Sequence, residues 1–416
     1  MAKDDEFTRS LRIPKLCLLL SGIKIDQPLQ TAFFSFLKNY YLFIFNLIIT
    51  GLCIPCEIGW CLSSKMGFVG LTYMMPCIVY GILGFVKIAN ILHKVDIISK
   101  LIKDLHGMFP GNSDYKESED IDEEAESDIV IDSLKLSRKV VFVLFWTNLL
   151  LILLFDLRPL IVLAFKYFAH GQLELSLPMF MNYPFDPYDL RFWPIAYGHQ
   201  CYSSACCIYN LIGPDTLFFV CCTHLYMQFR ILKRRLEIFI TGSEIGGELE
   251  VAKKFSILAK RHQKLIELVG RLERVYSTSI FLNYGCSSFL ICFTGFNVTT
   301  LNDAWSVLNY LVFFSSNVSQ IFLICLFGDL IMNSSREVAD GIYNCKWYAT
   351  TPKIRRSILF YLVRSQKPCK LTAINFADVN LISFTTILSR SWSYFALLRT
   401  VMSTRSQEQQ TLAAIA

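Results

Sequence analysis

The hydrophobic and polar positions along the chain separate into long apolar stretches and shorter polar segments. A helix that crosses a lipid bilayer needs about 20 consecutive, mostly apolar residues. Seven stretches reach this length, and they cover approximately Asn39–Cys61, Gly67–Ala89, Val140–Phe165, Tyr202–Leu225, Tyr276–Phe296, Val307–Ile331 and Phe376–Leu398. The pattern therefore predicts an all-α membrane protein with seven transmembrane helices.

Lysine and arginine gather in alternate segments between these stretches, and this sets the predicted orientation. Cytoplasmic loops of membrane proteins accumulate basic residues. Of the 40 basic residues, 31 lie in segments 1–36, 90–139, 226–275 and 332–370, whereas 5 lie in the segments on the other side. We therefore expect a cytosolic N-terminus and an extracellular C-terminus, which is the reverse of a G-protein-coupled receptor.

This topology divides the chain into cytosolic, membrane and extracellular segments. An acidic run from Asp114 to Asp132 favours a solvated connector, because the spacing and central glycine of an EF-hand are missing. The predicted segments are 1–38 (cytosolic N-terminal segment), 39–225 (transmembrane helices one to four, with an acidic cytosolic loop at 106–133 and an outer loop at 166–200), 226–275 (cytosolic helical region), 276–331 (transmembrane helices five and six), 332–370 (cytosolic segment), 371–402 (seventh helix) and 403–416 (extracellular tail).

Composition agrees with a membrane protein and narrows the classes of function. The 416 residues are 53% hydrophobic and 18% charged, against roughly 25% charged in an ordinary soluble domain. The 15 cysteines lie mostly in apolar stretches, which predicts buried small hydrophobes and no disulfide framework. Nucleophile elbow, P-loop, dinucleotide-binding and metalloprotease motifs are missing from the sequence. We therefore expect that the protein is not an enzyme and that it binds no cofactor, metal or nucleic acid.

The segment before the fifth stretch has a heptad pattern. Its apolar positions alternate steps of four and three residues and continue into the membrane stretch; they are Val251, Phe255, Leu258, His262, Leu265, Val269, Leu272 and Tyr276. We expect one helix that begins in the cytosol and continues into lipid. Packing within one subunit and packing at a subunit interface both satisfy this pattern.

Charged residues interrupt several apolar stretches, and each needs a structural reason because charges in a bilayer are costly. We expect Asp215 to face the protein interior or a water-filled cavity. Asp156 and Arg158 either pair with each other or mark where the third helix leaves the lipid, and we favour the second interpretation. On the seventh helix, Arg390 and Tyr394 share a face with several hydroxyl groups. That face suits a pore or a polar interface better than lipid.

Aromatic and soft apolar side chains gather in the outer halves of the second, third, fourth and sixth stretches. Aromatic walls with a few polar groups are typical of sites for small, mostly apolar ligands. Ordinary helix packing is the alternative explanation for each residue. The candidate ligand-binding residues are Tyr73, Met74, Ile78, Leu150, Leu153, Tyr209, Tyr310, Phe313, Phe314 and Asn317.

The last third of the chain resembles the insect odorant receptor family. The runs Lys367–Ala373 (KPCKLTA) and Ser391–Leu398 (SWSYFALL) are similar to the C-terminal motifs of that family. The stretch from Ser334 to Tyr348 upstream also resembles it. The outer-loop run Tyr183–Tyr188 (YPFDPY) is similar to lepidopteran members.

The resemblance implies a heterotetrameric, ligand-gated, non-selective cation channel, formed with a shared co-receptor in the dendritic membrane of an olfactory neuron. In that family the cytosolic helices, here in 226–275, form the subunit anchor, and the seventh helix, here 371–402, lines the pore. The implied gate falls at Leu397 and a polar pore position at Thr400. The co-receptor and the gustatory relatives carry Gln at the latter position, so the chain resembles an odorant-tuning subunit.

The implied ligand is a small volatile odorant or pheromone that binds in the outer half of the bundle. Two alternatives remain open from the sequence. One is a membrane transporter for small apolar solutes, although the internal repeat common in transporters is missing from the sequence. The other is a gustatory-type chemosensory channel that forms homotetramers.

Overall fold

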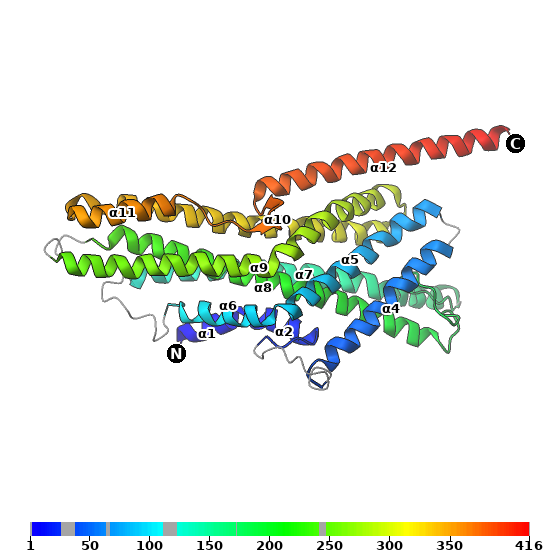
Figure 1. The fold of residues 1–416 in the computed structure, drawn as a ribbon. Helices are drawn as coiled ribbons and strands as arrows, with labels where there is room; N and C mark the ends of the chain where they lie inside the picture. The colour runs from blue at the N-terminus through cyan, green and yellow to red at the C-terminus, as the bar shows by residue number, and fades with distance from the viewer. Residues whose placement is uncertain are drawn as a thin grey trace.

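The structure is a computed structural model, and it describes residues 2–25, 38–63, 67–110, 123–171, 173–240 and 247–415. These residues form an elongated bundle of helices that lie roughly lengthwise (Figure 1). Six helices are long and apolar enough to cross a membrane: α4 (Tyr41–Ser63), α5 (Gly67–His93), α7 (Glu123–His170), α8 (Trp193–Ile238), α9 (Glu248–Thr300) and α10 (Ala304–Asn344). With α12 (Leu381–Ile415) as the seventh, the predicted all-α, seven-helix fold class is confirmed. Arg390 and the neighbouring serines make α12 less apolar than the other six.

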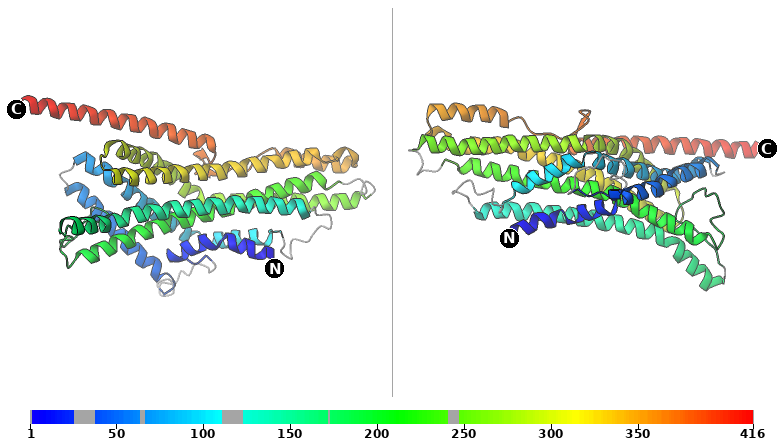
Figure 2. Two further views of the ribbon diagram at one scale, coloured as in Figure 1. Left: turned by 180° about the vertical axis from the view of Figure 1, so that it is seen from behind. Right: turned by 60° about the horizontal axis from the view of Figure 1, so that its bottom comes forward.

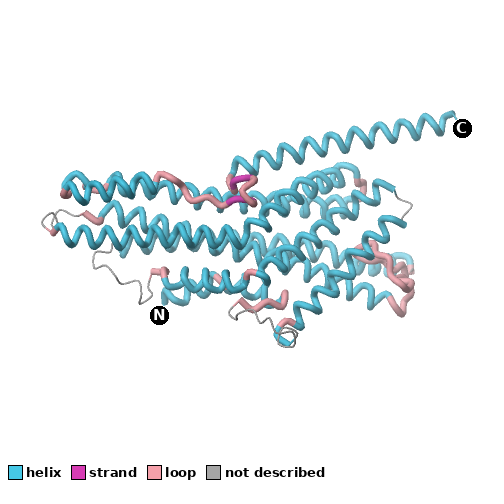
Figure 3. Tube along the Cα trace, viewed as in Figure 1, coloured by secondary structure: helices cyan, strands magenta, loops and turns pink. Residues whose placement is uncertain are grey.

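Shorter elements complete the fold around these long helices. Antiparallel pairing places Thr372 opposite Asp378 and Ala373 opposite Ala377, so that a small hairpin precedes α12 (Figure 3). The shorter elements are α1 (Ala2–Ser10), α2 (Arg12–Leu20), α6 (Val95–Gly107), a 3₁₀ turn (Trp347–Ala349), α11 (Pro352–Ser365), β1 (Thr372–Ala373) and β2 (Ala377–Asp378).

Helix α9 is longer than a bilayer is thick. At 1.5 Å per residue its 53 residues span about 80 Å, whereas the hydrocarbon core is about 30 Å thick. The heptad segment and the fifth apolar stretch lie on this one helix, so the predicted continuity of these two segments is confirmed. In Figure 1, α8, α9 and α10 all extend past α4 and α5 toward the left of the view.

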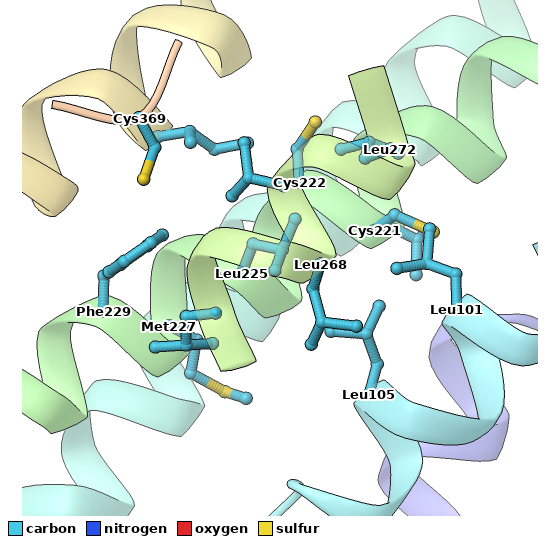
Figure 4. Packing of buried hydrophobic residues seen from close by; sticks show 14 of the residues in the cluster. Leu101, Leu105, Cys221, Cys222, Leu225, Met227, Phe229, Leu268, Leu272 and Cys369 are labelled. Carbon is cyan, nitrogen blue, oxygen red and sulfur yellow. The ribbon is translucent and has the colours of Figure 1, made fainter. Parts of the chain in front are cut away.

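The heptad seam of α9 is covered within one subunit. All eight seam residues are buried, and Leu265 and Leu272 are completely so. Figure 4 shows Leu268 and Leu272 of α9 beside residues of α6 and α8, including Leu101 and Leu225. Of the two interpretations of the seam, packing within the subunit is therefore the one that the structure supports.

The predicted end of the acidic loop was wrong. Helix α7 begins at Glu123, inside the predicted acidic loop 106–133, of which residues 111–122 lie outside the described residues. The reason is a buried ion pair, because the Arg235 guanidinium donates to both carboxylate oxygens of Glu126 at 2.6 and 3.1 Å. Pairing with a cation holds this acidic stretch against α8 and lets it fold as helix.

The seventh helix begins later and ends later than predicted. Phe376 lies in the turn of the β1–β2 hairpin and is 75% exposed, so the helix starts only at Leu381. Ile374 and Asn375 have positive φ angles of 53° and 56°, a conformation that stops any helix. At the other end α12 continues through the predicted tail to Ile415, and its C-terminal part stands apart from the bundle (Figure 2, left).

Several membrane helices contain a proline, and in α5 a side chain of a neighbouring helix replaces the lost donor. Pro76 in α5 has no N–H to donate to the carbonyl of Thr72. The Asn297 amide donates to that carbonyl instead, at 2.9 Å. In lipid such a carbonyl cannot turn to water, so this contact fixes α9 against the kink in α5.

Candidate ligand-binding cavity and pore helix

A cavity lies in the half of the bundle that holds α4 and α5. Helices α4, α5, α7, α8 and α10 and the loop between α7 and α8 contribute to its lining. Its volume is about 80 Å³, several times what one buried water needs. The lining is mostly apolar or sulfur-containing, with a few hydroxyl groups and one carboxyl group; it consists of Thr50, Cys53, Ile54, Glu57, Cys77, Tyr80, Gly81, Leu151, Ile152, Phe155, Met179, Ser203, Ser204, Cys207, Ile208 and Phe313.

The loop between α7 and α8 closes the cavity on its outer side. Met179 of this loop lines the cavity, and Gln200 of α8 holds its backbone from both sides. The Gln200 amide donates to the Met179 carbonyl at 3.1 Å, and its oxygen accepts from the Met179 N–H at 2.9 Å. The Trp193 indole N–H also donates to the Ser176 carbonyl at 2.9 Å. The loop is therefore an ordered roof.

A buried ion pair lies beneath the cavity. Lys87 of α5 donates to both carboxylate oxygens of Asp215 of α8, at 2.8 and 2.9 Å, and its side chain is 2% exposed. The Gln320 amide of α10 donates to the same carboxylate. Asp215 thus faces the protein interior, as expected. Tyr80 lies between the cavity and the ion pair, because it lines the cavity and also a smaller space beside Asp215.

The charged residues at the outer end of α7 have separate partners. Arg158 pairs with Asp303 at 3.0 Å, and Asp303 also caps the N-terminus of α10. Hydrogen bonds from the Ser306 hydroxyl and backbone N–H lower the pKa of Asp303, and Arg158 adds to this effect. Asp156 is buried and accepts from the Ser204 hydroxyl at 2.7 Å. The two residues thus have different partners and are not paired with each other, and α7 continues past both of them to His170.

The candidate ligand-binding residues take several positions relative to the cavity. Phe313 is the one that lines it. Met74 and Ile78 are buried in a cluster that also contains Met179, so they lie directly behind the roof.

The other candidates lie farther from the cavity. Tyr310 donates from its hydroxyl to the Tyr73 carbonyl at 2.8 Å, and the two rings meet edge to face with centroids 5.4 Å apart. Asn317 is buried and donates to the Phe313 carbonyl. Phe314 packs toward α9 and α12. Outside this group, Tyr209 is half-buried, and Leu150 and Leu153 are 47% and 44% exposed.

Helix α4 contributes four lining residues that the sequence did not indicate: Thr50, Cys53, Ile54 and Glu57. One signal was present for this helix. Glu57 is a carboxylate within the first apolar stretch, and an ionisable residue inside a membrane helix is by default a candidate functional residue.

The predicted pore residues lie on the exposed surface of α12. Leu397 is 64% exposed and Tyr394 is 42% exposed, and Arg390 and Thr400 are exposed as well. Tyr394 stacks on Phe289 of α9 with ring centroids 5.8 Å apart. The helix thus rests on α9 along one side and leaves the other side open.

The sequence is similar to those of known odorant receptors. Residues 67–391 match the family described as 7tm Odorant receptor. The chain is 29% identical over 283 residues to Odorant receptor 13a of Drosophila melanogaster, an alignment that covers 64% of this chain and 67% of the relative. It is 25% identical over 392 residues to Odorant receptor 67c of the same species, with 91% of each chain covered.

Solved structures of an insect olfactory receptor have the same fold. OR5 from Machilis hrabei matches with a TM-score of 0.80 at 17% identity, over 96% of this chain and 100% of that chain. The same receptor in complex with eugenol matches with a TM-score of 0.79 at 16% identity, over 95% and 98% of the two chains. Because the family match extends over more than half of the chain, the protein belongs to the 7tm odorant receptor family, a family of multi-pass membrane receptors in insect olfaction and not of enzymes.

Proposed function

We propose that this protein is the odorant-binding subunit of a ligand-gated, non-selective cation channel that it forms with a shared co-receptor. The observation that carries the proposal is the cavity itself. It is lined by five helices and by an ordered loop, and most of its side chains are apolar, as a site for a small volatile organic molecule requires.

Exposed apolar side chains support assembly with other subunits. On the cytosolic helix α11, Leu359, Phe360 and Val363 are 60%, 78% and 64% exposed. A cluster of this kind outside the membrane is typical of a protein interface. The heptad seam of α9 is already buried within the subunit. The proposed anchor contact with the co-receptor therefore involves α11.

Helix α10 offers a route from the cavity to the pore helix. Phe313 lines the cavity, whereas its neighbour Phe314 packs in a cluster with Ile291 of α9 and Ile387 of α12. A ligand that displaces Phe313 would shift the same helix against α12. In this proposal the shift changes the position of Leu397, the proposed gate.

The energy needed for gating favours ligand shape over any one apolar contact. A change from 1% to 99% open requires about 5.5 kcal/mol of differential binding energy per gating unit, whereas one buried methylene contributes about 0.8 kcal/mol. Several contacts must therefore differ between the closed and open cavities, and ligands of different shape should differ strongly in efficacy.

The test is to record ligand-evoked currents from cells that express this chain with and without the co-receptor. We expect currents only with the co-receptor. Phe313→Ala should raise the half-maximal ligand concentration by about tenfold or more and change the ranking of ligands, because a buried phenyl group contributes about 1.5–3 kcal/mol. Phe165→Ala is the matched control, since that side chain is 68% exposed at the outer end of α7.

Three results would contradict the proposal in different ways. Equal currents without the co-receptor would support a homotetrameric, gustatory-type channel. Ligand uptake without current would support a transporter. An unchanged ligand ranking in Phe313→Ala would show that the ligand does not bind in this cavity.

A further inference from the structure

Glu57 is a carboxyl group that lines the proposed odorant cavity and has no partner among the described residues. Its residue is 4% exposed and its side chain forms part of the lining. Within the described part of the chain it makes no hydrogen bond and no ion pair. Buried charges in proteins are almost always paired because an isolated one is costly, so the position of Glu57 needs a functional explanation.

Basic residues of the surrounding helices already have other partners, and the His199 ring contacts Cys53 and the Tyr183 hydroxyl. Lys87, beneath the cavity, is bonded to Asp215. Arg158, on the outer side, is bonded to Asp303. None of the described residues that line the cavity is basic. The cavity therefore has no positive charge of its own to balance Glu57.

Two hydroxyl groups of the lining present acceptors to the cavity. The Thr50 hydroxyl donates to the Asn46 carbonyl at 2.8 Å, and the Ser204 hydroxyl donates to Asp156 at 2.7 Å. Both protons are thus directed away from the cavity, and the oxygens remain free to accept.

A second carboxyl group lies behind Ser204 and adds a further hydrogen-bond acceptor near the cavity. Asp156 is buried, and its Oδ1 atom has no hydrogen-bond partner among the described residues. This carboxyl group is one hydroxyl group away from the cavity. A ligand with N–H or O–H donors complements such a lining, and a ligand that is also positively charged complements it best.

We propose that the cavity selects small organic amines, which donate from the ammonium group to Glu57 while the hydrocarbon part packs against Phe155, Ile208 and Phe313. The ammonium group turns an uncompensated buried carboxylate into a hydrogen-bonded ion pair. The apolar walls hold an alkyl or aryl group. This inference rests on the proposed function, since it names the ligand class of the same cavity.

The experiment compares butylamine with 1-butanol, which have the same number of non-hydrogen atoms. The readout is the half-maximal concentration of 1-butanol divided by that of butylamine. We measure it in two ways: from currents in cells that also express the co-receptor, and from the unfolding temperature of the purified full chain in lipid nanodiscs. We expect a ratio of at least about 10 in the wild type, a difference of about 1.4 kcal/mol.

Substitutions at Glu57 test whether its carboxylate causes the preference for butylamine over 1-butanol. Glu57→Gln keeps the shape and removes the charge, so the ratio should fall to about 1, whereas Glu57→Asp keeps the charge and should retain a ratio above that of Glu57→Gln. Glu337→Gln is the matched control, because that carboxylate pairs with Lys233 in the cytosolic part, and the ratio should stay at the wild-type value.

A wild-type ratio at or below 1, or a ratio that Glu57→Gln leaves unchanged, would overturn the inference. If Glu57→Gln does not fold, the wild type and Glu57→Asp still decide it. The two readouts separate this inference from the proposed function. Amine-selective stabilisation without any current would support the cavity chemistry and contradict the channel function, whereas currents that favour 1-butanol would do the opposite.

Discussion

The buried ion pair beneath the cavity offers a quantitative test of the membrane core. Lys87→Met is the most informative single change, because methionine has a similar length, no branch and no charge. It leaves the Asp215 carboxylate buried with the Gln320 amide as its remaining partner among the contacts described above. The free energy of unfolding should therefore fall by the cost of an uncompensated charge, reduced by this one hydrogen bond.

The size of the effect follows from the geometry. Two unit charges 2.8 Å apart attract by about 6 kcal/mol at an effective dielectric constant of 20, and the loss of hydration of both groups offsets much of this. Breaking a buried pair by removing one partner costs about 3–5 kcal/mol. Since the Gln320 amide still donates to the carboxylate, we expect a loss of about 3 kcal/mol for Lys87→Met.

A double-mutant cycle separates this pair energy from other effects. Asp215→Leu alone should cost about 3–5 kcal/mol, but the double variant should be more stable than either single variant, because the two charges are then removed together. The assay is thermal unfolding in lipid nanodiscs. The exposed pair Lys233–Glu337 is the control, and Lys233→Met should cost at most about 1 kcal/mol. A double variant that is the least stable of the three would refute the reasoning.

Two further changes test the base of the pore helix and the roof of the cavity. In Gly328→Ala the new Cβ would lie 2.2 Å from the Val379 carbonyl oxygen, so we expect lower thermal stability and smaller currents, despite a gain of up to about 1 kcal/mol in helix propensity. Gly270→Ala has nothing within 4 Å of its Cβ and should be neutral or stabilising; equal effects of the two variants would contradict the contact. Gln200→Ala removes both hydrogen bonds to Met179, each contributing about 0.5–1.5 kcal/mol. It should speed the decay of current after ligand washout severalfold, and an unchanged decay would show that the roof does not retain the ligand.

The membrane helices were predictable because their apolar length is a strong signal, but the directions in which their side chains point were not. On α7, Leu150 and Leu153 are exposed toward lipid, whereas Leu151 and Ile152 line the cavity. In a helix that meets lipid on one side and protein on the other, both faces are apolar. Periodicity therefore carries no information about which leucine faces a ligand.

Outside lipid the same reasoning succeeded, because one face of a helix there must meet water. The α9 seam from Val251 to Tyr276 was predicted residue by residue, and every member is buried. The start of α12 was missed for a different reason. Phe376 continues the apolar pattern, but the positive φ angles of Ile374 and Asn375 form a turn at that point, and neither residue is a glycine that would have indicated it.

The length of α9 has a mechanical consequence for the receptor. The helix has no proline between Glu248 and Thr300, so one continuous helix with a contour length of about 80 Å connects its two ends. A tilt of about 3° about its midpoint moves each end by about 2 Å over this length. An antibody or protein bound at the cytosolic end of α9 that changes this tilt would therefore alter odorant affinity, and odorant would alter the affinity of that partner by the same factor.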